Sequence, residues 1–399
     1  MSRKFCLPEH ISAEDFLRDY WQKKPLIIRN GLPEIVGMFE PEDILELAQN
    51  EDVTARLLKQ FSEDSWTFTP SPLTERDFTE LPEKWSVLVQ NMEQWSAELG
   101  RLWNLFGFIP QWQRDDIMVS YAPAGGSVGK HYDEYDVFLV QGYGQRRWQL
   151  GKWCDPSTEF KPNQPIRIFD DMGELVVDEV MNPGDILYIP SRMAHYGVAQ
   201  SDCLTFSFGL RYPNLSDLME RIQHGFCYQN PEIDLNEFSI PLRLNQSAQA
   251  TGKLSETEIQ AMKRQLLEKL TSSPQFDRLF RQAVASAVSS HRYEMLVSDE
   301  ISEPEEVLTA LENGAKLLQD NNCKLVYTSN PLCIYANGEW LDELNSVEAE
   351  ILKRLADGEG LALTDLMQLI QQTDERDLAM DLLLDGICNW LDDGWILLN

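Results

Sequence analysis

The sequence predicts a mixed α+β protein in which a β-rich domain lies between two largely helical regions. Six short runs of β-forming residues occur between residues 116 and 213, separated by Gly, Pro and Asp, whereas helical apolar spacing dominates before and after them. Many short strands with turn residues between them favour a β-sandwich or barrel over a βαβ fold. The chain of 399 residues is long enough for two or three domains. The six runs are Ile117–Ala122, Val137–Val140, Trp148–Leu150, Leu175–Val180, Ile186–Ile189 and Leu204–Leu210.

The first hundred residues are expected to be mixed and mainly helical. A short helix should begin at Ser12 and run through Trp21, with apolar residues at helical spacing. Pro25 ends this helix, and Leu26–Ile28 is expected to be a strand. The stretch 85–106 places apolar residues every three or four positions, which predicts an amphipathic helix.

Helical patterns return beyond the β-rich region. A capping box at Ser255 begins one helix, and Pro274 begins a second whose apolar residues share one face. The acidic stretch 302–306 is expected to be a linker, and a hairpin is predicted around Pro331. These elements and the helices after them would form a small α+β module. The later helical patterns are 347–355, 361–371 and 378–390.

The charge balance restricts the class of partner. Lys and Arg number 34 against 65 Asp and Glu, which gives a formal net charge of -31. Such a field repels nucleic acid phosphates and anionic lipid and attracts cationic partners, although acidity can also serve solubility alone. No segment approaches the roughly 18 apolar residues of a membrane span, and the N-terminal residues do not form a secretory signal. The scattered cysteines fit reduced thiols, so we expect a cytoplasmic protein. From the negative charge and the lack of a long apolar segment, we expect no direct binding to nucleic acid or to a membrane.

Two of the five histidines occur in a pattern typical of a metal site. His131 and Asp133 precede an expected strand, and on an extended chain residues i and i+2 point to the same face. His195 follows Asp133 by 62 residues (195 − 133), just beyond the turn, buried strand and proline of residues 183–190. The pattern therefore predicts that these three side chains bind one metal ion.

Two imidazoles and one carboxylate form the facial triad of non-haem Fe(II) oxygenases. They occupy one face of an octahedral ion and leave three positions open for a bidentate 2-oxo acid and O₂, which a closed four-ligand zinc site does not allow. An isolated His-x-Asp pair is a weak signal, because most histidines on strands have structural roles. The buried strand and the histidine that follow at this spacing make the signal much stronger.

A 2-oxo acid with a distal carboxylate needs a cation in its pocket, and arginine supplies one through two parallel hydrogen bonds. Arg146 and Arg147 follow the strand after the His-x-Asp pair. Neighbours on a strand face opposite sides, so only one of them can point inward, and a solvated basic pair is the alternative. Ser120 and Thr205, each on an expected strand, are candidate hydroxyl donors to the same pocket.

Five segments carry a recognisable combination of motifs: residues 116–120, the Gly-Gly-x-x-Gly run before His131, residues 136–142, Arg146–Trp148, and Trp21–Pro25. Together they resemble the bacterial JmjC ribosomal oxygenases. The resemblance extends over nearly the whole chain and implies a double-stranded β-helix, the jelly roll of JmjC and cupin proteins. It also implies a JmjC catalytic domain with N-terminal helical and strand elements over 1–212, a helical dimerisation region over 213–300 and a winged-helix-like domain over 301–399. We therefore expect a homodimer.

The resemblance also implies roles for individual residues. Arg146 matches the residue that binds the distal carboxylate of 2-oxoglutarate, and Ser120 matches a pocket residue, whereas the family has a different polar residue where Thr205 stands. The residues that match the iron ligands are His131, Asp133 and His195. The most similar family members hydroxylate the β-carbon of an arginine in a basic large-subunit ribosomal protein, a substrate that suits an acidic enzyme.

Three alternatives compete with this interpretation. The target could be a histidine of a ribosomal protein. The chain could also be a metal-binding cupin without oxygenase activity, although such proteins often carry a further Glu ligand and Glu134, next to Asp133, points away. An inactive scaffold is the third alternative, and an intact triad with a fitting arginine argues against it. The acidic residues between 374 and 393 disfavour DNA binding by the C-terminal module.

Overall fold

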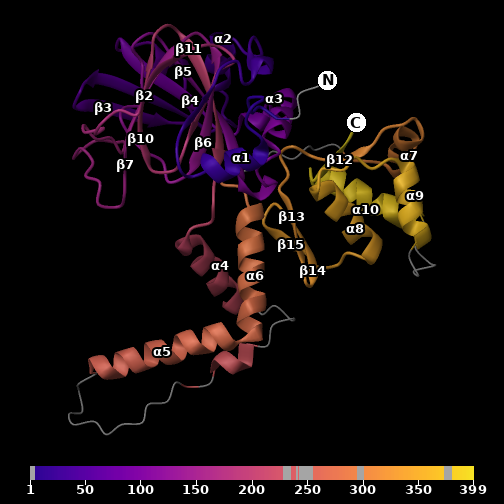
Figure 1. The fold of residues 1–399 in the computed structure, drawn as a ribbon. Coiled ribbons are helices and arrows are strands. Elements are labelled where there is room, and N and C mark those ends of the chain that lie inside the picture. The colour runs from indigo at the N-terminus through magenta and orange to yellow at the C-terminus, as the bar shows by residue number, and fades with distance from the viewer. Residues whose placement is uncertain (1–4, 228–234, 240, 242–254, 294–300, 373–379) are drawn as a thin grey trace. The chain divides into compact units, whose positions relative to one another are not determined.

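The computed structural model describes residues 5–227, 235–239, 241, 255–293, 301–372 and 380–399 (Figure 1). The chain divides into two compact units. The first unit contains residues 1–212 together with 291–297, and the second contains 213–290 and 298–399. Each unit has a hydrophobic core of its own.

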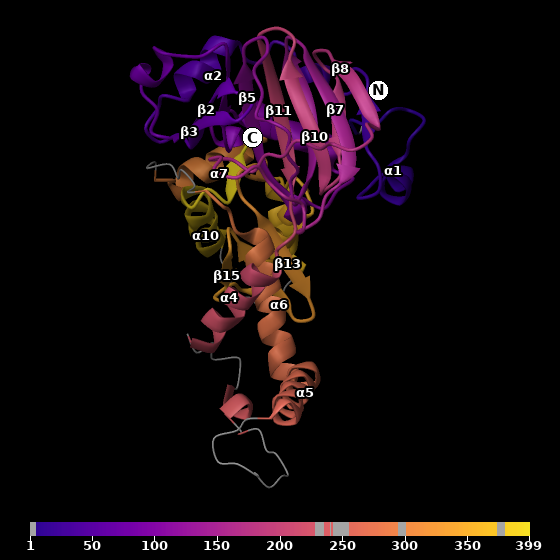
Figure 2. The ribbon, with the colours of Figure 1, turned by 90° about the vertical axis from the view of Figure 1, so that its left-hand side faces the viewer.

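Two antiparallel β-sheets form the first unit (Figures 1 and 2). The larger sheet has eight strands in the order β1-β9-β6-β11-β5-β4-β2-β3, and the smaller has three in the order β10-β7-β8. Neighbouring strands such as β9 and β6 are far apart in the sequence, as in a jelly roll. The strands are β1 (Leu26–Ile28), β2 (Ala55–Ser62), β3 (Ser65–Pro70), β4 (Lys84–Val89), β5 (Arg114–Ala122), β6 (Asp136–Tyr143), β7 (Arg146–Trp153), β8 (Val177–Met181), β9 (Ile186–Ile189), β10 (Met193–Ala199) and β11 (Cys203–Leu210).

Side chains of the larger sheet alternate between two cores. Val137 of β6 packs with Trp148 of β7 in a cluster that fills the space between the sheets. Phe138, the next residue, points to the opposite face, where its ring lies 5.7 Å from that of Phe16 and 5.1 Å from that of Phe106. The N-terminal elements therefore cover the outer face of the larger sheet, and the face toward the smaller sheet is left for the pocket described below.

The N-terminal predictions have mixed outcomes. The helix after Ser12 is confirmed as α1 (Ala13–Asp19), which begins with a capping box, and the strand Leu26–Ile28 is confirmed as β1. The single helix expected over 85–106 is wrong. Trp85–Val89 belongs to β4, where every one of these residues is buried because the strand lies between β2 and β5. A strand that is buried on both faces lacks the alternation of apolar and polar residues that identifies a strand in the sequence. The apolar residues of this strand also fit the spacing of a helix, which explains the wrong prediction.

The remaining elements of this region are short. They are α2 (Pro41–Leu47), α3 (Ala97–Arg101) and the 3₁₀ helices Pro33–Ile35, Glu75–Phe78, Met92–Gln94, Leu102–Phe106 and Gln111–Gln113.

The β-rich region forms as expected, since each of the six predicted runs lies on or overlaps a strand. Strands β2, β3 and β10 were not predicted. On β10, Gly197 stands where a side chain would not fit, because a Cβ there would lie 2.6 Å from the ring of Trp148. A glycine in the middle of the strand weakens the sequence pattern and at the same time allows the close approach of β10 to β7.

Among the described residues, the first α-helices of the second unit are α4, α5 and α6, and α5 and α6 start at the predicted capping box and proline. The linker expected at 302–306 is wrong in part, because α7 begins at Pro304 and buries Val307 and Leu311. The predicted hairpin around Pro331 is present as β13 and β14. The elements are α4 (Leu215–Cys227), the 3₁₀ helix Leu235–Ser239, α5 (Glu256–Ser272), α6 (Pro274–Ser289), α7 (Pro304–Glu312), β12 (Leu317–Gln319), β13 (Leu325–Ser329), β14 (Leu332–Ala336), β15 (Glu339–Leu341), α8 (Ser346–Ala356), α9 (Leu363–Gln372), α10 (Met380–Asp392) and β16 (Ile396–Leu398).

None of the helices within the described ranges combines the length and the apolar character that crossing a membrane requires. No disulfide bond links the cysteines that the structure describes.

Candidate active site

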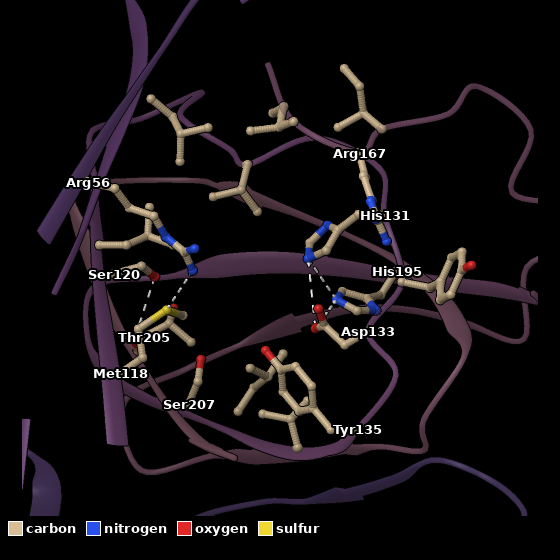
Figure 3. Close-up of a pocket in the computed structure, with 18 of the residues that line it drawn as sticks. Arg56, Met118, Ser120, His131, Asp133, Tyr135, Arg167, His195, Thr205 and Ser207 are labelled. Carbon is tan, nitrogen blue, oxygen red and sulfur yellow. Dashed lines mark hydrogen bonds and ion pairs between the residues drawn. The ribbon is translucent and has the colours of Figure 1, made fainter. Parts of the chain in front are cut away.

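A pocket of about 380 Å³ lies between the two sheets of the first unit (Figure 3). All six residues that the sequence singled out line this pocket. His131 and Asp133 come from the extended segment before β6, and His195 comes from β10. The other three are Arg146 on β7, Ser120 on β5 and Thr205 on β11.

The three predicted metal ligands converge on one point. Nε2 of His131 lies 3.1 Å from Nε2 of His195, and Oδ2 of Asp133 lies 4.0 Å from the first nitrogen and 3.6 Å from the second. All three ligand atoms lie within 4.8 Å of one another. An ion with bonds of about 2.0–2.1 Å can contact all three from one side.

The backbone fixes the orientation of both imidazoles. Nδ1 of His131 is 3.0 Å from the carbonyl oxygen of Gly129, and Nδ1 of His195 is 2.9 Å from that of Met193. A carbonyl oxygen only accepts, so each neutral ring carries its proton on Nδ1 and presents a lone pair on Nε2. Two lone pairs at 3.1 Å cannot hydrogen-bond to each other. The donor set therefore fits a shared divalent cation.

The surroundings of His195 keep its ring neutral. Its side chain is 4% exposed. Burial, and to a smaller extent the neighbouring His131, lower the pKa of His195 to about 4. At neutral pH the ring is therefore unprotonated, as a metal ligand must be.

Arg146 and Arg147 point in opposite directions from β7. Arg147 extends outward and forms a salt bridge with Asp178 at 2.6 Å. Arg146 is 3% exposed and donates from Nη1 to Ser120 Oγ at 3.0 Å. Its Nε and Nη2 are buried without a hydrogen-bond partner among the described residues. Buried guanidinium N–H groups require acceptors, so the pocket is built for an anionic group of a ligand at this point.

Ser120 and Thr205 have different environments within the pocket. Ser120 Oγ accepts the hydrogen bond from Arg146 and so lies where an anion bound by that arginine would be. Thr205 Oγ1 donates to Gln141 Oε1 at 3.0 Å, so its proton is directed to the amide rather than to the open pocket. Ser120 Oγ itself donates to the carbonyl oxygen of Thr205 at 3.4 Å. Both hydroxyl protons are thus directed to other groups of the chain, and Ser120 differs from Thr205 in its contact with the Arg146 guanidinium.

The pocket also contains residues that the sequence analysis missed as pocket residues. These residues are Arg56, Arg167 and Arg211. Tyr135, which the sequence suggested as a residue near the mouth of the site or a packing residue, also lines the pocket, and its ring lies 4.2 Å from the Arg211 guanidinium. Arg56 was missed because β2 was not recognised as a strand of the sheet. Arg211 follows the predicted strand that carries Thr205, and its position next to that strand was a usable signal.

Comparisons with known proteins identify the class of protein. Residues 101–218 match the JmjC domain family, and residues 263–389 match the ROXA-like winged helix. The chain is 74% identical over 396 residues to a probable ribosomal oxygenase of Haemophilus influenzae, covering 99% of this chain and 98% of the relative. It is 28% identical over 337 residues to the ribosomal protein uL16 3-hydroxylase of Escherichia coli, covering 82% and 85% of the two chains.

Solved structures agree with the sequence comparisons. The X-ray structure of E. coli YcfD superposes with a TM-score of 0.77 at 25% identity, covering 98% of this chain and 99% of the other. A structure of the same protein in complex with cobalt and 2-oxoglutarate superposes with a TM-score of 0.75 at 25% identity and covers the same shares of the two chains.

The JmjC jelly roll and its His-Asp-His site place the protein among the 2-oxoglutarate-dependent dioxygenases, which use Fe(II). Within that class, the chain belongs to the JmjC ribosomal oxygenase family. The predicted fold class, family and enzyme class are confirmed.

Removing one of the three convergent side chains should abolish tight metal binding. The variant His195→Ala leaves only two ligand atoms on one face of the ion, so Co(II) titrated by calorimetry should show no stoichiometric site. His10→Ala, which changes an exposed histidine, should bind Co(II) like the unmodified protein. Equal stoichiometric binding by both variants would remove His195 from the ligand set.

Proposed function

We propose that this protein hydroxylates a large-subunit ribosomal protein, with the β-carbon of an arginine as the reacting position. The observation that carries the proposal is the arrangement of the pocket, with a three-ligand site at one end and the unpartnered N–H groups of Arg146 at the other. A 2-oxo acid that chelates the metal through its 1-carboxylate and 2-oxo groups can extend its distal carboxylate to Arg146.

His131, Asp133 and His195 would hold Fe(II) and leave half of its coordination sphere open. When bound, Fe(II) would activate O₂ with 2-oxoglutarate as the two-electron reductant: 2-oxoglutarate would be converted to succinate and CO₂, one oxygen atom of O₂ would enter succinate, and the other would be inserted into a C–H bond of the substrate. The chain itself positions the reactants and keeps the site away from bulk water. Arg146 and Ser120 would bind the distal carboxylate of the co-substrate and so orient it toward the metal.

The ribosomal substrate is supported by the relatives and by the charge of the chain. One relative is named for 3-hydroxylation of ribosomal protein uL16, and another as a probable ribosomal oxygenase. The net charge of -31 attracts a basic protein and accelerates its encounter with the enzyme. A ribosomal protein substrate also supports a cytoplasmic location for the enzyme, since ribosomal proteins of bacteria are made in the cytoplasm. Direct binding of nucleic acid is not part of the proposal.

A buried carboxylate beside the pocket supports arginine as the target side chain. Met118 and Ser120 line the pocket from β5, and Asp116 lies two residues before Met118 on the same strand, where the pairing of β5 with β11 shifts register. Asp116 is 7% exposed and accepts hydrogen bonds from two neutral donors, Gln90 Nε2 at 2.8 Å and the Asn91 backbone N–H at 3.3 Å. The charge of Arg211 also acts on this carboxyl and lowers its pKa, by less than burial raises it. Burial and the neighbouring Asp115 raise the pKa of Asp116 to about 6. The guanidinium of a substrate arginine that reached Asp116 would stabilise the ionised form of this buried carboxyl.

The alternatives have weaker support. A histidine target would be uncharged at neutral pH and would gain little from Asp116. A metal-binding cupin without oxygenase activity would not need the unpartnered guanidinium of Arg146 opposite the metal ligands. Glu134, the additional carboxylate near the site, forms a salt bridge with Arg192 at 2.6 Å. It is therefore directed away from the ion, as the sequence suggested.

We also propose that two copies of the chain associate through the helical region 213–300. Helix α5 is 17 residues long and has no buried residue. Its exposed side chains include Ile259, Leu266 and Leu267, which are 41%, 49% and 50% accessible. An apolar face of this size requires a covering surface, and a second copy supplies a self-complementary one. Residues 301–399 would form the winged-helix-like C-terminal domain, which belongs to the same compact unit as residues 213–290.

The reaction is tested with purified protein, Fe(II), ascorbate and 2-oxoglutarate. A peptide from the uL16 protein should stimulate succinate formation and gain the mass of one oxygen on its arginine. Arg146→Ala should raise the KM for 2-oxoglutarate by about tenfold or more, because hydrogen bonds between charged groups are lost. Arg147→Ala is the matched control and should leave the KM unchanged. Equal effects of the two substitutions would refute the role given to Arg146.

The role of Asp116 predicts a separable effect on the peptide. Asp116→Asn should raise the KM for the arginine peptide by about tenfold, without changing the KM for 2-oxoglutarate. In the unmodified enzyme, Asp116 takes up a proton as the pH falls through about 6, so the KM for the peptide should rise there. This rise should be absent in the variant. A variant with an unchanged peptide KM and pH profile would contradict the assignment.

The dimer is tested by light scattering coupled to size-exclusion chromatography. Leu266→Glu combined with Leu267→Glu places two charges on the exposed apolar face of α5 and should convert the dimer to a monomer. Leu382→Glu, which changes an exposed leucine of α10, is the control and should leave the mass unchanged. A monomeric unmodified protein, or a dimer that tolerates both charges, would exclude this interface.

A further inference from the structure

A second arginine in the pocket also lacks an acidic partner. Arg56 of β2 lines the pocket, and its Nε is buried without a hydrogen-bond partner. Its Nη2 lies 3.5 Å from Sδ of Met118, and a thioether is only a weak acceptor. Within the described ranges, no carboxylate forms a salt bridge with Arg56. Its guanidinium is thus directed into the pocket without a group that neutralises it.

The register of the larger sheet places Arg56 in line with the co-substrate end of the pocket. Arg56 pairs with Leu88 of β4, and Leu88 pairs with Ser120 of β5. Paired residues of neighbouring strands point to the same face, so these three side chains form one row. Two strand spacings separate β2 from β5, about 10 Å. The side chain of Arg56 spans most of this distance, and Figure 3 shows it extending toward Ser120 and Met118.

Arg146 reaches the same part of β5 from the smaller sheet. It donates to Ser120 Oγ at 3.0 Å, while Arg56 contacts Met118, two residues away on the same face of the strand. Two guanidiniums that approach one place in a partly buried pocket repel each other, and both retain buried N–H groups without acceptors. An anion between the two guanidiniums offsets their repulsion and also accepts hydrogen bonds from their unpaired N–H groups.

We propose that Arg56 is a second binding residue for the 2-oxo acid and that it shares the distal carboxylate with Arg146. The inference rests on the proposed function, in which this pocket binds a 2-oxo acid. A carboxylate offers about four acceptor positions, enough for two guanidiniums and the hydroxyl of Ser120. Two cations at this end select dicarboxylic 2-oxo acids over monocarboxylic ones such as pyruvate, which leave both arginines without a partner.

Calorimetry on the full chain loaded with Ni(II) tests the inference without turnover. N-oxalylglycine, an unreactive analogue of 2-oxoglutarate, has the distal carboxylate, whereas oxalate chelates the metal but lacks it. Arg56→Met should weaken binding of N-oxalylglycine by about tenfold or more and leave binding of oxalate unchanged. Arg147→Met is the matched control and should bind both ligands like the unmodified protein. Arg56→Lys keeps the charge and should show a smaller loss.

The double variant R56M/R146M tests whether the two arginines share one group. Its loss of N-oxalylglycine affinity should be smaller than the sum of the two single losses, because both act on the same carboxylate. Unchanged N-oxalylglycine binding by the Arg56 variants, or an equal loss of oxalate binding, would overturn the inference. An effect confined to the KM for the peptide would overturn it in favour of a substrate contact. Failure of the proposed function would appear separately, as absence of peptide-stimulated succinate formation in the unmodified enzyme.

Discussion

A pair of backbone hydrogen bonds between His131 and His195 holds the metal site together. The N–H of His131 donates to the carbonyl of His195 at 3.1 Å, and the N–H of His195 donates back at 2.8 Å. Residues that exchange two hydrogen bonds in an antiparallel ladder stand directly opposite each other with their side chains on one face. This pairing brings two imidazoles 64 residues apart in the sequence to 3.1 Å. The ligand geometry thus depends on the register of the fold rather than on flexible side chains.

The same fold separates the two charged ends of the pocket. The metal ligands lie on the segment before β6 and on β10, whereas Ser120, Arg146 and Arg56 lie on β5, β7 and β2. Negative ligand charge is thereby opposed by cations at both ends: the metal ion at one and guanidiniums at the other. A dianionic co-substrate is consistent with this arrangement, and the proposals for Arg146 and Arg56 both follow from it.

The two faces of the larger sheet have different functions. Its outer face is covered by N-terminal elements whose aromatic rings, among them Phe16 and Phe106, pack around Phe138 of β6. This packing covers the face of the sheet opposite the pocket. Its inner face carries the pocket, where Ser120 and Thr205 lie on strands rather than on loops. The second unit has its own core, and its long helix α5 exposes the apolar face that we assign to a second copy of the chain.

The sequence alone determined the chemistry of the site and much of the fold. The His-x-Asp pair with the later histidine predicted the metal ligands. The alternation of short β-runs with turn residues, a local signal, predicted a sandwich or barrel, and the family resemblance specified the jelly roll. The residue pattern left Arg146 and Arg147 open, since that choice depends on which face of β7 meets the larger sheet, and only the family resemblance favoured Arg146. The tertiary structure also revealed Arg56, because its strand was recognisable only from pairing with β4. Residues 85–89 were predicted as helix for the same reason: burial on both faces removes the alternation that identifies a strand, and only the neighbouring strands specify it.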